Sequence, residues 1–221
     1  MWTLISASPS PYARKVRIAL AEKGIPFTLQ TEVPWDGATV TPQYNPLEKL
    51  PVLILDNGEC VYESHYILEW LEAKHPEPAL LPSDIDERLF AKKVEVVCDG
   101  MCDAMVIAFF ERLREPEKQS EPWKARRAWL KLSRQMRKVE GGLRQLSTWI
   151  DERQGQYLIG DRLTIADLAI AAFLGWFAIR WSEHQWQSQY PKLKQYWEEL
   201  EALPHFKETR PSPQTIKDQV V

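Results

Sequence analysis

Short apolar strands and helical patterns alternate in the first third of the chain. An apolar stretch at residues 2–6 is followed by a helical pattern at 11–23, and a second strand pattern occupies 28–33. Two further strand patterns, at 51–55 and 60–62, flank an Asn-Gly pair. Because Asn-Gly tolerates positive φ at both central positions, this pair predicts a β-hairpin. A strand–helix–strand unit followed by a hairpin predicts a mixed four-stranded sheet with helices packed on it.

Only helical patterns follow the proline-rich break at His75-Pro76-Glu77-Pro78, which ends a helix that begins at Ser64. They lie at residues 84–114, from about 120 to 154, from 165 onward and at about 190–203. The sequence therefore predicts an α/β domain followed by an all-α domain. We expect a first domain at 1–77, a linker at 78–84, a helical domain at 85–206 and a loosely held polar tail at 207–221.

The helix from residue 165 has a clear start signal. Thr164 and Asp167 have the spacing of a capping box, and Leu163 and Leu168 occupy the staple positions around it. The residues that follow are apolar on every side of the helix rather than along one stripe. This pattern predicts a central helix that is surrounded by others.

Composition and charge exclude several classes of protein. The 221 residues are 44% hydrophobic, which is enough for a real core, and 28 basic against 31 acidic residues leave a net charge of -3. A nucleic-acid-binding protein would show a basic face, so neither nucleic acid nor an anionic membrane surface is an expected partner. The longest apolar run, at 165–179, contains Asp167 and is shorter than the roughly 20 residues of a membrane span.

Neither a disulfide framework nor a metal site is indicated. The three cysteines are too few for such a framework, and the four histidines have no metal-ligand spacing. The N-terminus lacks the basic and apolar regions of a signal peptide. We therefore expect a cytoplasmic protein whose cysteines stay reduced and which holds no metal.

The start of the helix at 11–23 is the first candidate for chemistry. Ser10 directly precedes Pro11, so its hydroxyl lies beside backbone N–H groups that have no partner inside the helix. The positive end of the helix dipole is at the same place, and such a position can hold a thiolate at neutral pH. Ser10 as a simple helix cap is the alternative, and the local sequence leaves both interpretations open.

Four short segments, in this order along the chain, together form a pattern that is typical of one protein family. They are Ser-Pro-Tyr at 10–12 followed by Arg14, Asn-Pro-Leu-Glu-Lys-Leu-Pro-Val-Leu at 45–53, Tyr-Glu-Ser at 62–64, and Gly-Asp-Arg-Leu-Thr-Ile-Ala-Asp at 160–167. With these segments the chain resembles the cytosolic glutathione transferases, and the likeness extends to about residue 206. The resemblance implies a thioredoxin-like first domain that binds glutathione and an all-helical second domain.

The resemblance assigns roles around the glutathione thiol. Ser10 matches the catalytic serine, whose hydroxyl donates a hydrogen bond to the sulfur, and Tyr12 is a competitor for that contact. Pro51 matches a cis-proline that turns the backbone of Leu50 outward to pair with the cysteinyl part of glutathione. A trans proline at the start of an edge strand is the structural alternative.

The two ends of glutathione are assigned in the same way. Glu63 matches a partner for the γ-glutamyl ammonium, and Ser64 at a helix N-terminus matches the site of the carboxylate, with a plain N-cap as the alternative. Lys49 is placed to meet the glycyl carboxylate, unless it is a solvated loop lysine. Glu48 departs from the family, which often has glycine at this position.

The helical domain is expected to supply the electrophile pocket, and ordinary core packing is the alternative for each candidate. The pocket candidates are Tyr12 from the first domain and Met105, Phe109, Phe110, Trp176 and Trp181 from the second. In a homodimer, which the family implies, Asp99 and Asp103 are candidates to reach the γ-glutamyl ammonium bound to the partner subunit.

The resemblance implies an enzyme, a glutathione transferase that ionises the thiol of its co-substrate glutathione and adds it to a small apolar electrophile. The alternatives are a glutathione-dependent isomerase, dehalogenase or disulfide reductase at the same site, and a non-catalytic interaction module of the same fold. No cysteine stands between Ser10 and Arg14, where relatives that form mixed disulfides usually carry one. The Ser-Ser-Cys run of maleylacetoacetate isomerases is absent as well.

Overall fold

The computed structural model describes residues 1–114 and 134–217 of the chain. Its strands are β1 (Trp2–Ser6), β2 (Phe27–Thr31), β3 (Val52–Ile54) and β4 (Cys60–Tyr62). They form one sheet in the order β2-β1-β3-β4, in which β1 is parallel to β2 and the other two pairs are antiparallel. The predicted mixed sheet of four strands is therefore confirmed.

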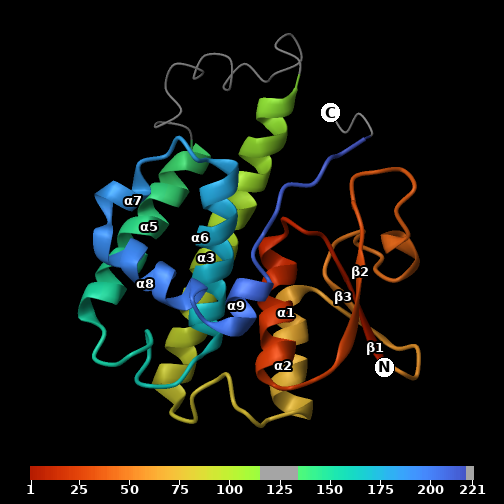
Figure 1. Ribbon diagram of the computed structural model, residues 1–221, viewed down its shortest axis with the longest axis horizontal. Helices are drawn as coiled ribbons and strands as arrows, with labels where there is room; N and C mark the ends of the chain where they lie inside the picture. The colour runs from red at the N-terminus through yellow and green to blue at the C-terminus, as the bar shows by residue number, and fades with distance from the viewer. Residues whose placement is uncertain (115–133, 218–221) are drawn as a thin grey trace.

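Two helices lie between the sheet and the helical bundle in Figure 1, namely α1 (Pro11–Glu22) and α2 (Ser64–Lys74). Leu4 and Leu53 of the sheet and Val16 and Ile67 of the helices are completely buried in the apolar core. A short 3-10 helix, η1 (Thr41–Gln43), lies in the long loop after β2. This arrangement leaves the N-terminal ends of α1 and α2 free to contribute to a site.

The hairpin between β3 and β4 is present, but its turn differs from the expectation. Gly58 N–H donates to the Leu55 carbonyl, and Leu55 N–H donates to the Glu59 carbonyl, both at 2.9 Å. Only Gly58 of the Asn-Gly pair has a positive φ, at 83°. The reason is that the loop has three residues and ends in a glycine bulge, in which Asn57 Oδ1 accepts a hydrogen bond from Glu59 N–H.

The second domain is entirely helical in its described part. Its helices are α3 (Ile85–Leu113), α5 (Arg134–Glu152), α6 (Ile165–Arg180), α7 (Trp186–Gln189), α8 (Pro191–Glu201) and α9 (Pro204–Glu208). The start expected near residue 120 lies outside the described residues. Helix α6 is buried along most of its length, as predicted for a central helix.

The predicted capping box fixes the start of α6. Thr164 N–H donates to the Asp167 carboxylate at 2.7 Å, and Leu158 N–H donates to the same carboxylate at 3.1 Å. The Tyr196 hydroxyl of α8 also donates to it. Because a buried carboxylate is tolerated only when donors surround it, this cluster ties α8 to the first turn of α6.

A buried arginine joins the two domains. Arg14 of α1 is 1% exposed, and its guanidinium lies 2.7 Å from the Glu201 carboxylate of α8. It also donates to the carbonyls of Ala171 in α6 and Phe206 in α9, at 2.9 and 3.0 Å. Gly175 of α6 leaves the space for it, because a Cβ there would lie 2.4 Å from Arg14 Nη1.

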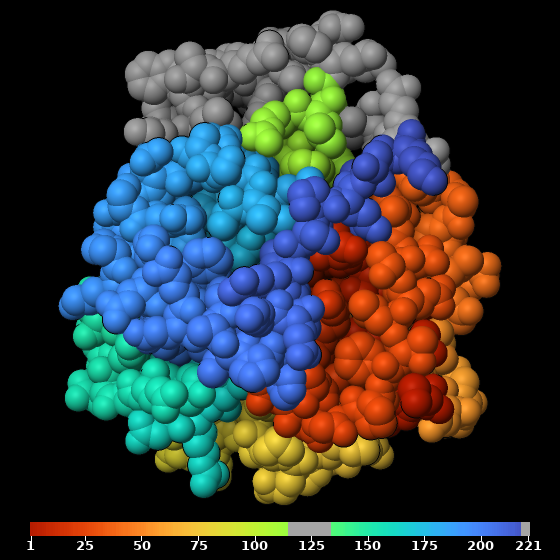
Figure 2. All heavy atoms as spheres, viewed as in Figure 1, coloured from red at the N-terminus to blue at the C-terminus, as the bar shows by residue number. Residues whose placement is uncertain are grey.

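Residues 210–217 return from α9 to the first domain and lie against it (Figure 2). The sequence predicted a loosely held tail here, and in its described part Arg210, Gln214 and Lys217 make hydrogen bonds to residues of both domains. Within the described parts of the chain, no helix is both long enough and apolar enough to cross a membrane.

Candidate active site

A cavity of about 620 Å³ lies between the first domain and the helical domain. Its walls come from the start of α1, the loop after β2, the segment before β3, helices α3 and α6, and the C-terminal segment. Ten of the residues proposed from the sequence lie on these walls: Ser10, Tyr12, Lys49, Leu50, Glu63, Asp99, Asp103, Phe109, Phe110 and Trp176.

Ser10 is the N-cap of α1 and lines the cavity. Its Oγ accepts a hydrogen bond from Ala13 N–H at 3.2 Å. This bond uses a lone pair of the hydroxyl and leaves its proton free, because a serine hydroxyl has one donor and two acceptor sites. Among the described residues, none accepts that proton. The capping role and a donor role are therefore compatible in one side chain.

The peptide bond between Leu50 and Pro51 is cis, as the sequence predicted. Pro51 itself is buried, and Leu50 lies on the cavity wall just before β3. Asn45, which is 1% exposed, supports this segment by donating from Nδ2 to the Lys49 carbonyl at 2.8 Å. Lys49 is exposed, so its ammonium group is free to move toward an anion at the edge of the cavity.

Glu48 and Glu63 are the two non-glycine residues with positive φ in the described parts of the chain, at 55° and 74°. A side chain makes this backbone conformation unfavourable, and glycine adopts it without that cost. The positive φ at residue 48 explains why a glycine suits this place in relatives. Both strained residues line the cavity.

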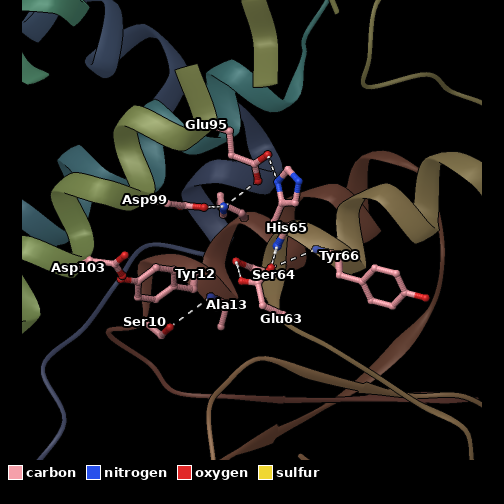
Figure 3. A network of polar contacts seen from close by, with 11 residues as sticks. Ser10, Tyr12, Ala13, Glu63, Ser64, His65, Tyr66, Glu95, Asp99 and Asp103 are labelled. Atoms are coloured by element: carbon pink, nitrogen blue, oxygen red, sulfur yellow. Dashed lines mark hydrogen bonds and ion pairs between the residues drawn. The ribbon is translucent and has the colours of Figure 1, made fainter. Parts of the chain in front are cut away.

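Glu63, rather than Ser64, is the N-cap of α2. The Glu63 carboxylate accepts hydrogen bonds from His65 N–H at 3.0 Å and Tyr66 N–H at 3.3 Å (Figure 3). Ser64 is the first helical residue and is 1% exposed, with its hydroxyl 3.5 Å from Glu63. The alternative that Ser64 acts only as a cap is therefore wrong, because the neighbouring carboxylate occupies that position.

A network of charged side chains lies behind this corner of the cavity. Lys15 of α1 is 1% exposed, and its Nζ lies 2.8 Å from Glu95 and 2.7 Å from Asp99, both on α3. Glu95 also accepts a hydrogen bond from His65 Nδ1 at 2.8 Å, which links α2 to the same group (Figure 3). The network therefore joins the three helices that surround Ser10 and Glu63.

Electrostatics favour the charged forms of Lys15, His65 and Glu95, whereas burial raises the pKa of Asp99. Burial alone would lower the pKa of Lys15, but the carboxylates of Asp99 and Glu95 outweigh it, so that the pKa is raised. The hydrogen bond to Glu95 raises the pKa of His65 above 6.5. Burial alone would raise the pKa of Glu95, but His65 and Lys15 outweigh it, so that the pKa of this carboxyl is lowered.

Tyr12 lies beside Ser10 but its hydroxyl is engaged elsewhere. It donates to the Asp103 carboxylate of α3 (Figure 3), and burial raises the pKa of the phenol well above its ordinary value. The phenol therefore stays protonated with its proton directed at Asp103. This geometry favours Ser10 over Tyr12 as a donor to a sulfur in the cavity.

The other half of the cavity is mainly apolar and aromatic. Trp35 from the loop after β2 meets the ring of Phe110 on α3 edge-on, with centroids 4.3 Å apart. Trp176 of α6 and Phe109 of α3 line the same half. Arg180 of α6 places its guanidinium 4.6 Å from the centre of the Phe109 ring, and it lines the cavity there.

Comparison with known proteins identifies the family. Residues 9–74 match the family model described as "Glutathione S-transferase, N-terminal domain", and residues 127–199 match the model of the C-terminal domain. The chain belongs to the glutathione S-transferase family.

Relatives align over nearly the whole chain. A glutathione S-transferase from Methylobacterium radiotolerans, solved with glutathione sulfonate, has a TM-score of 0.91 and 52% identity, covering 100% of this chain and 99% of that one. The uncharacterised glutathione-S-transferase-like protein YibF of Escherichia coli is 33% identical over 94% of this chain and 98% of its own length. A probable maleylacetoacetate isomerase of Drosophila melanogaster is 30% identical over 96% of this chain and 82% of its own.

Four of the predicted site residues, Pro51, Ser64, Met105 and Trp181, do not line the cavity of this glutathione S-transferase. Pro51 and Ser64 are buried next to Leu50 and Glu63 in the chain, and Trp181 is 3% exposed. Met105 is 0% exposed and packs in the core. On α3 the residues that line the cavity, such as Asp99, Asp103 and Val106, recur at helical spacing, and Met105 points away from their face.

Trp35, Arg180, Gln214 and Ile216 are among the lining residues of the cavity that were not predicted from the sequence. An arginine at the end of an apolar helix and a tryptophan in a polar loop are signals that were available for two of them. Nothing in the local pattern of the tail pointed to Gln214 or Ile216. Asp99 and Asp103, the candidates to reach a partner's ligand, contact Lys15 and Tyr12 of their own chain.

No group of three or more histidine, cysteine or carboxylate side chains in the described residues is arranged to hold a metal ion.

We predict that the His65–Glu95 contact stabilises the fold more in acid than in alkali. Because the folded state raises the pKa of His65, its contribution is fully present below the ordinary value of 6.5 and is lost as the pH rises through the raised value. The difference in unfolding free energy between the wild type and His65→Gln, measured by denaturant titration, should therefore shrink with rising pH. A difference that stays constant or grows with pH would contradict this.

Proposed function

We propose that the chain is a glutathione transferase, which binds glutathione, holds its thiol as a thiolate and joins the sulfur to a small apolar electrophile. The observation that carries this proposal is one cavity with two unlike halves. A hydroxyl donor at a helix N-terminus, a backbone edge and a strained carboxylate make up one half. Aromatic side chains dominate the other.

Ser10 is the proposed catalytic residue. A free thiol has a pKa of about 8.5, and each unit by which it is lowered corresponds to about 1.4 kcal/mol in favour of the thiolate. A hydrogen bond from the free Ser10 proton to the charged sulfur supplies about 1.5–3 kcal/mol. The N-terminus of α1 adds up to about 1 kcal/mol through the helix dipole. Together these contributions are enough to ionise the thiol near neutral pH.

Leu50 is proposed to bind the cysteinyl backbone of glutathione. The register of β3 begins at Val52, which pairs with Ile5 and Tyr62, so Leu50 lies beyond the paired part of the sheet. An extended peptide placed along this edge continues the ladder through main-chain hydrogen bonds. Lys49 is then near the glycyl end of the peptide, where its ammonium group meets the carboxylate.

Glu63 and Ser64 are proposed to hold the γ-glutamyl end. Glu63 is exposed and anionic, which suits it to the ammonium group of glutathione. Its carboxylate already accepts two backbone N–H groups of α2, so it is oriented before the ligand arrives. Ser64 offers its own N–H and hydroxyl to the carboxylate at the first turn of the helix. Because Ser64 is buried, the γ-glutamyl carboxylate must come close to the N-terminus of α2 to reach it.

The aromatic half is proposed as the electrophile pocket, with Tyr12, Phe109 and Trp176 as lining residues. Its rings offer large apolar surfaces for a flat or compact substrate. Met105 is excluded from this role, since it lies in the core.

A glutathione-dependent isomerase is the second candidate, and Arg180 is the observation that favours it. A guanidinium in an otherwise apolar half of the cavity suits a substrate with a carboxylate, because arginine matches carboxylate geometry. A relative named as a probable maleylacetoacetate isomerase fits the same candidate. Product masses separate the two, because conjugates gain the mass of the tripeptide and isomers gain nothing.

A disulfide reductase finds little support in the described cysteines. Cys98 and Cys102 are buried in the core, where burial raises the pKa of both thiols and keeps them unreactive. Cys60 is partly exposed but does not line the cavity. A dehalogenase and a non-catalytic module remain alternatives that a substrate panel and glutathione titration distinguish.

We also propose the domain limits expected from the sequence, a cytoplasmic location and a homodimer. The dimer proposal is supported by exposed apolar side chains on α2 and α3. Tyr66, Leu89 and Val96 are 56%, 57% and 63% exposed. Leu89 and Val96 are seven residues apart and share one face of α3, while His65 beside Tyr66 contacts that helix. A second copy of the chain would cover this surface.

We predict that Ser10→Ala raises the pKa of bound glutathione by about 1–2 units, because the thiolate loses a charged hydrogen bond. Conjugation measured as kcat/KM near neutral pH should fall by about tenfold or more, while calorimetric glutathione affinity changes little. Thiolate formation is followed by its ultraviolet absorbance.

Two variants control for this substitution. Ser8→Ala removes a nearby hydroxyl that does not line the cavity and should behave as the wild type. Ser10→Asp keeps an acceptor for Ala13 N–H but has no proton to donate, so it should lose activity without loss of the cap. An Ser10→Ala variant with unchanged thiolate formation would remove Ser10 from the mechanism.

We predict that the wild type sediments as a dimer and that Val96→Asp shifts it toward the monomer. An unpaired charge buried in the interface costs about 3–5 kcal/mol of association free energy. Leu113→Asp, at an exposed apolar position at the other end of α3, is the matched control and should leave the dimer intact. A wild-type monomer at working concentration rules out the dimer.

A further inference from the structure

The segment after α9 is anchored first to the helical domain. Arg210 donates from Nε to the Glu201 carboxylate at 3.1 Å and from Nη2 to the Glu201 carbonyl at 2.9 Å. Pro211 follows and lies close to Gly175 of α6, since its Cδ is 3.5 Å from the position of a Cβ built there. Glu201 also binds the interdomain guanidinium of Arg14, so the segment starts at the most firmly fixed point between the domains.

The same segment is then attached to the first domain. Gln214 donates from Nε2 to the Glu32 carbonyl at 3.1 Å, and Lys217 N–H donates to Asp36 Oδ1 at 2.9 Å. Glu32 and Asp36 flank Trp35 in the loop after β2. In Figure 1 the segment runs from α9 toward the side of the molecule that carries this loop. It therefore spans the cavity from one domain to the other.

Alternate residues of this segment face the cavity. Gln214 and Ile216 line it and are partly buried, whereas Thr215 and Lys217 are exposed. This period of two is that of an extended chain, in which successive side chains point in opposite directions. Gln214 and Lys217 bond to Glu32 and Asp36, on either side of Trp35, and the Trp35 ring meets Phe110 of α3. This end of the segment therefore lies at the aromatic half of the cavity.

We propose that residues 214–217 form a strap across the electrophile half of the cavity, and that Gln214 and Ile216 decide which electrophiles fit. The proposal rests on the proposed transferase function and adds specificity-determining residues to it. Two hydrogen bonds at a partly exposed site hold the end of the strap, and each such bond is individually weak. The strap is therefore closed in this structure but is held weakly enough to open for substrate entry and product release.

The position of the strap predicts different effects on the two substrates, glutathione and the electrophile. Ile216 and Gln214 act on the electrophile and leave the glutathione half untouched. A change in the strap should alter the relative kcat/KM of a bulky and a small electrophile while the KM for glutathione stays the same. A purely structural tail would lower both rates together with thermal stability.

The test compares Ile216→Trp with Thr215→Trp, which adds the same bulk at the neighbouring outward position. Ile216→Trp should lower kcat/KM for a bulky aryl electrophile by about tenfold or more relative to a small alkyl one, because overfilling a packed cavity is costly. Thr215→Trp should leave this ratio unchanged. A chain that ends at Pro213 lacks the strap and should shift the ratio toward the bulky electrophile. Asp36→Ala, which removes the acceptor of the Lys217 N–H, should shift it in the same direction.

A second measurement does not depend on turnover. The affinity of the apolar fluorophore anilinonaphthalene sulfonate, titrated by fluorescence, should fall by about tenfold in Ile216→Trp and stay unchanged in Thr215→Trp. Equal probe affinities in these variants, or an unchanged electrophile ratio in an active truncated chain, overturn the strap. A wild type that neither conjugates nor binds glutathione overturns the transferase proposal instead, and the probe titration still decides the strap.

Discussion

The buried Arg14 guanidinium sets the position of α1 against the helical domain. A charge that is 1% exposed is stable only if it is fully compensated, and here one carboxylate and two backbone carbonyls from three helices surround it. Any rotation of α1 would break these contacts at once. Because Ser10 caps the same helix, the arginine also fixes the distance between the hydroxyl and the cavity walls of α3 and α6. Burial lowers the pKa of Arg14, and Glu201 opposes that effect.

The glutathione half of the cavity is oriented before any ligand binds. Glu63 is held in a strained backbone conformation by the two N–H groups that it caps, and Lys15 is held between two carboxylates. These contacts restrict side chains that would otherwise sample many rotamers, so less entropy is lost when a ligand is bound. The network also connects α1, α2 and α3, the three helices around Ser10 and Glu63.

The electrophile half is organised differently. Its lining side chains come from the loop after β2, from helices and from the C-terminal segment, and two hydrogen bonds rather than buried charge hold that segment against the first domain. A transferase of this kind uses one constant co-substrate and variable electrophiles. A rigid half and an adaptable half of the cavity suit these two roles. Loops and termini can change sequence at little cost to the core, because few buried groups depend on them.

The sequence by itself determined the sheet, the two-part organisation, the capped central helix and most of the residues of the proposed glutathione half. Those features follow from local periodicity, turn residues and short motifs, which act over a few neighbouring positions. Only the tertiary structure decided that Glu63 rather than Ser64 caps α2, that the Tyr12 hydroxyl donates its hydrogen bond to Asp103, and that Met105 faces the core. It also placed Trp35, Arg180 and Ile216 on the walls of one cavity. These outcomes depend on side chains that are distant in sequence and meet only when the helices pack, and no local pattern encodes that meeting.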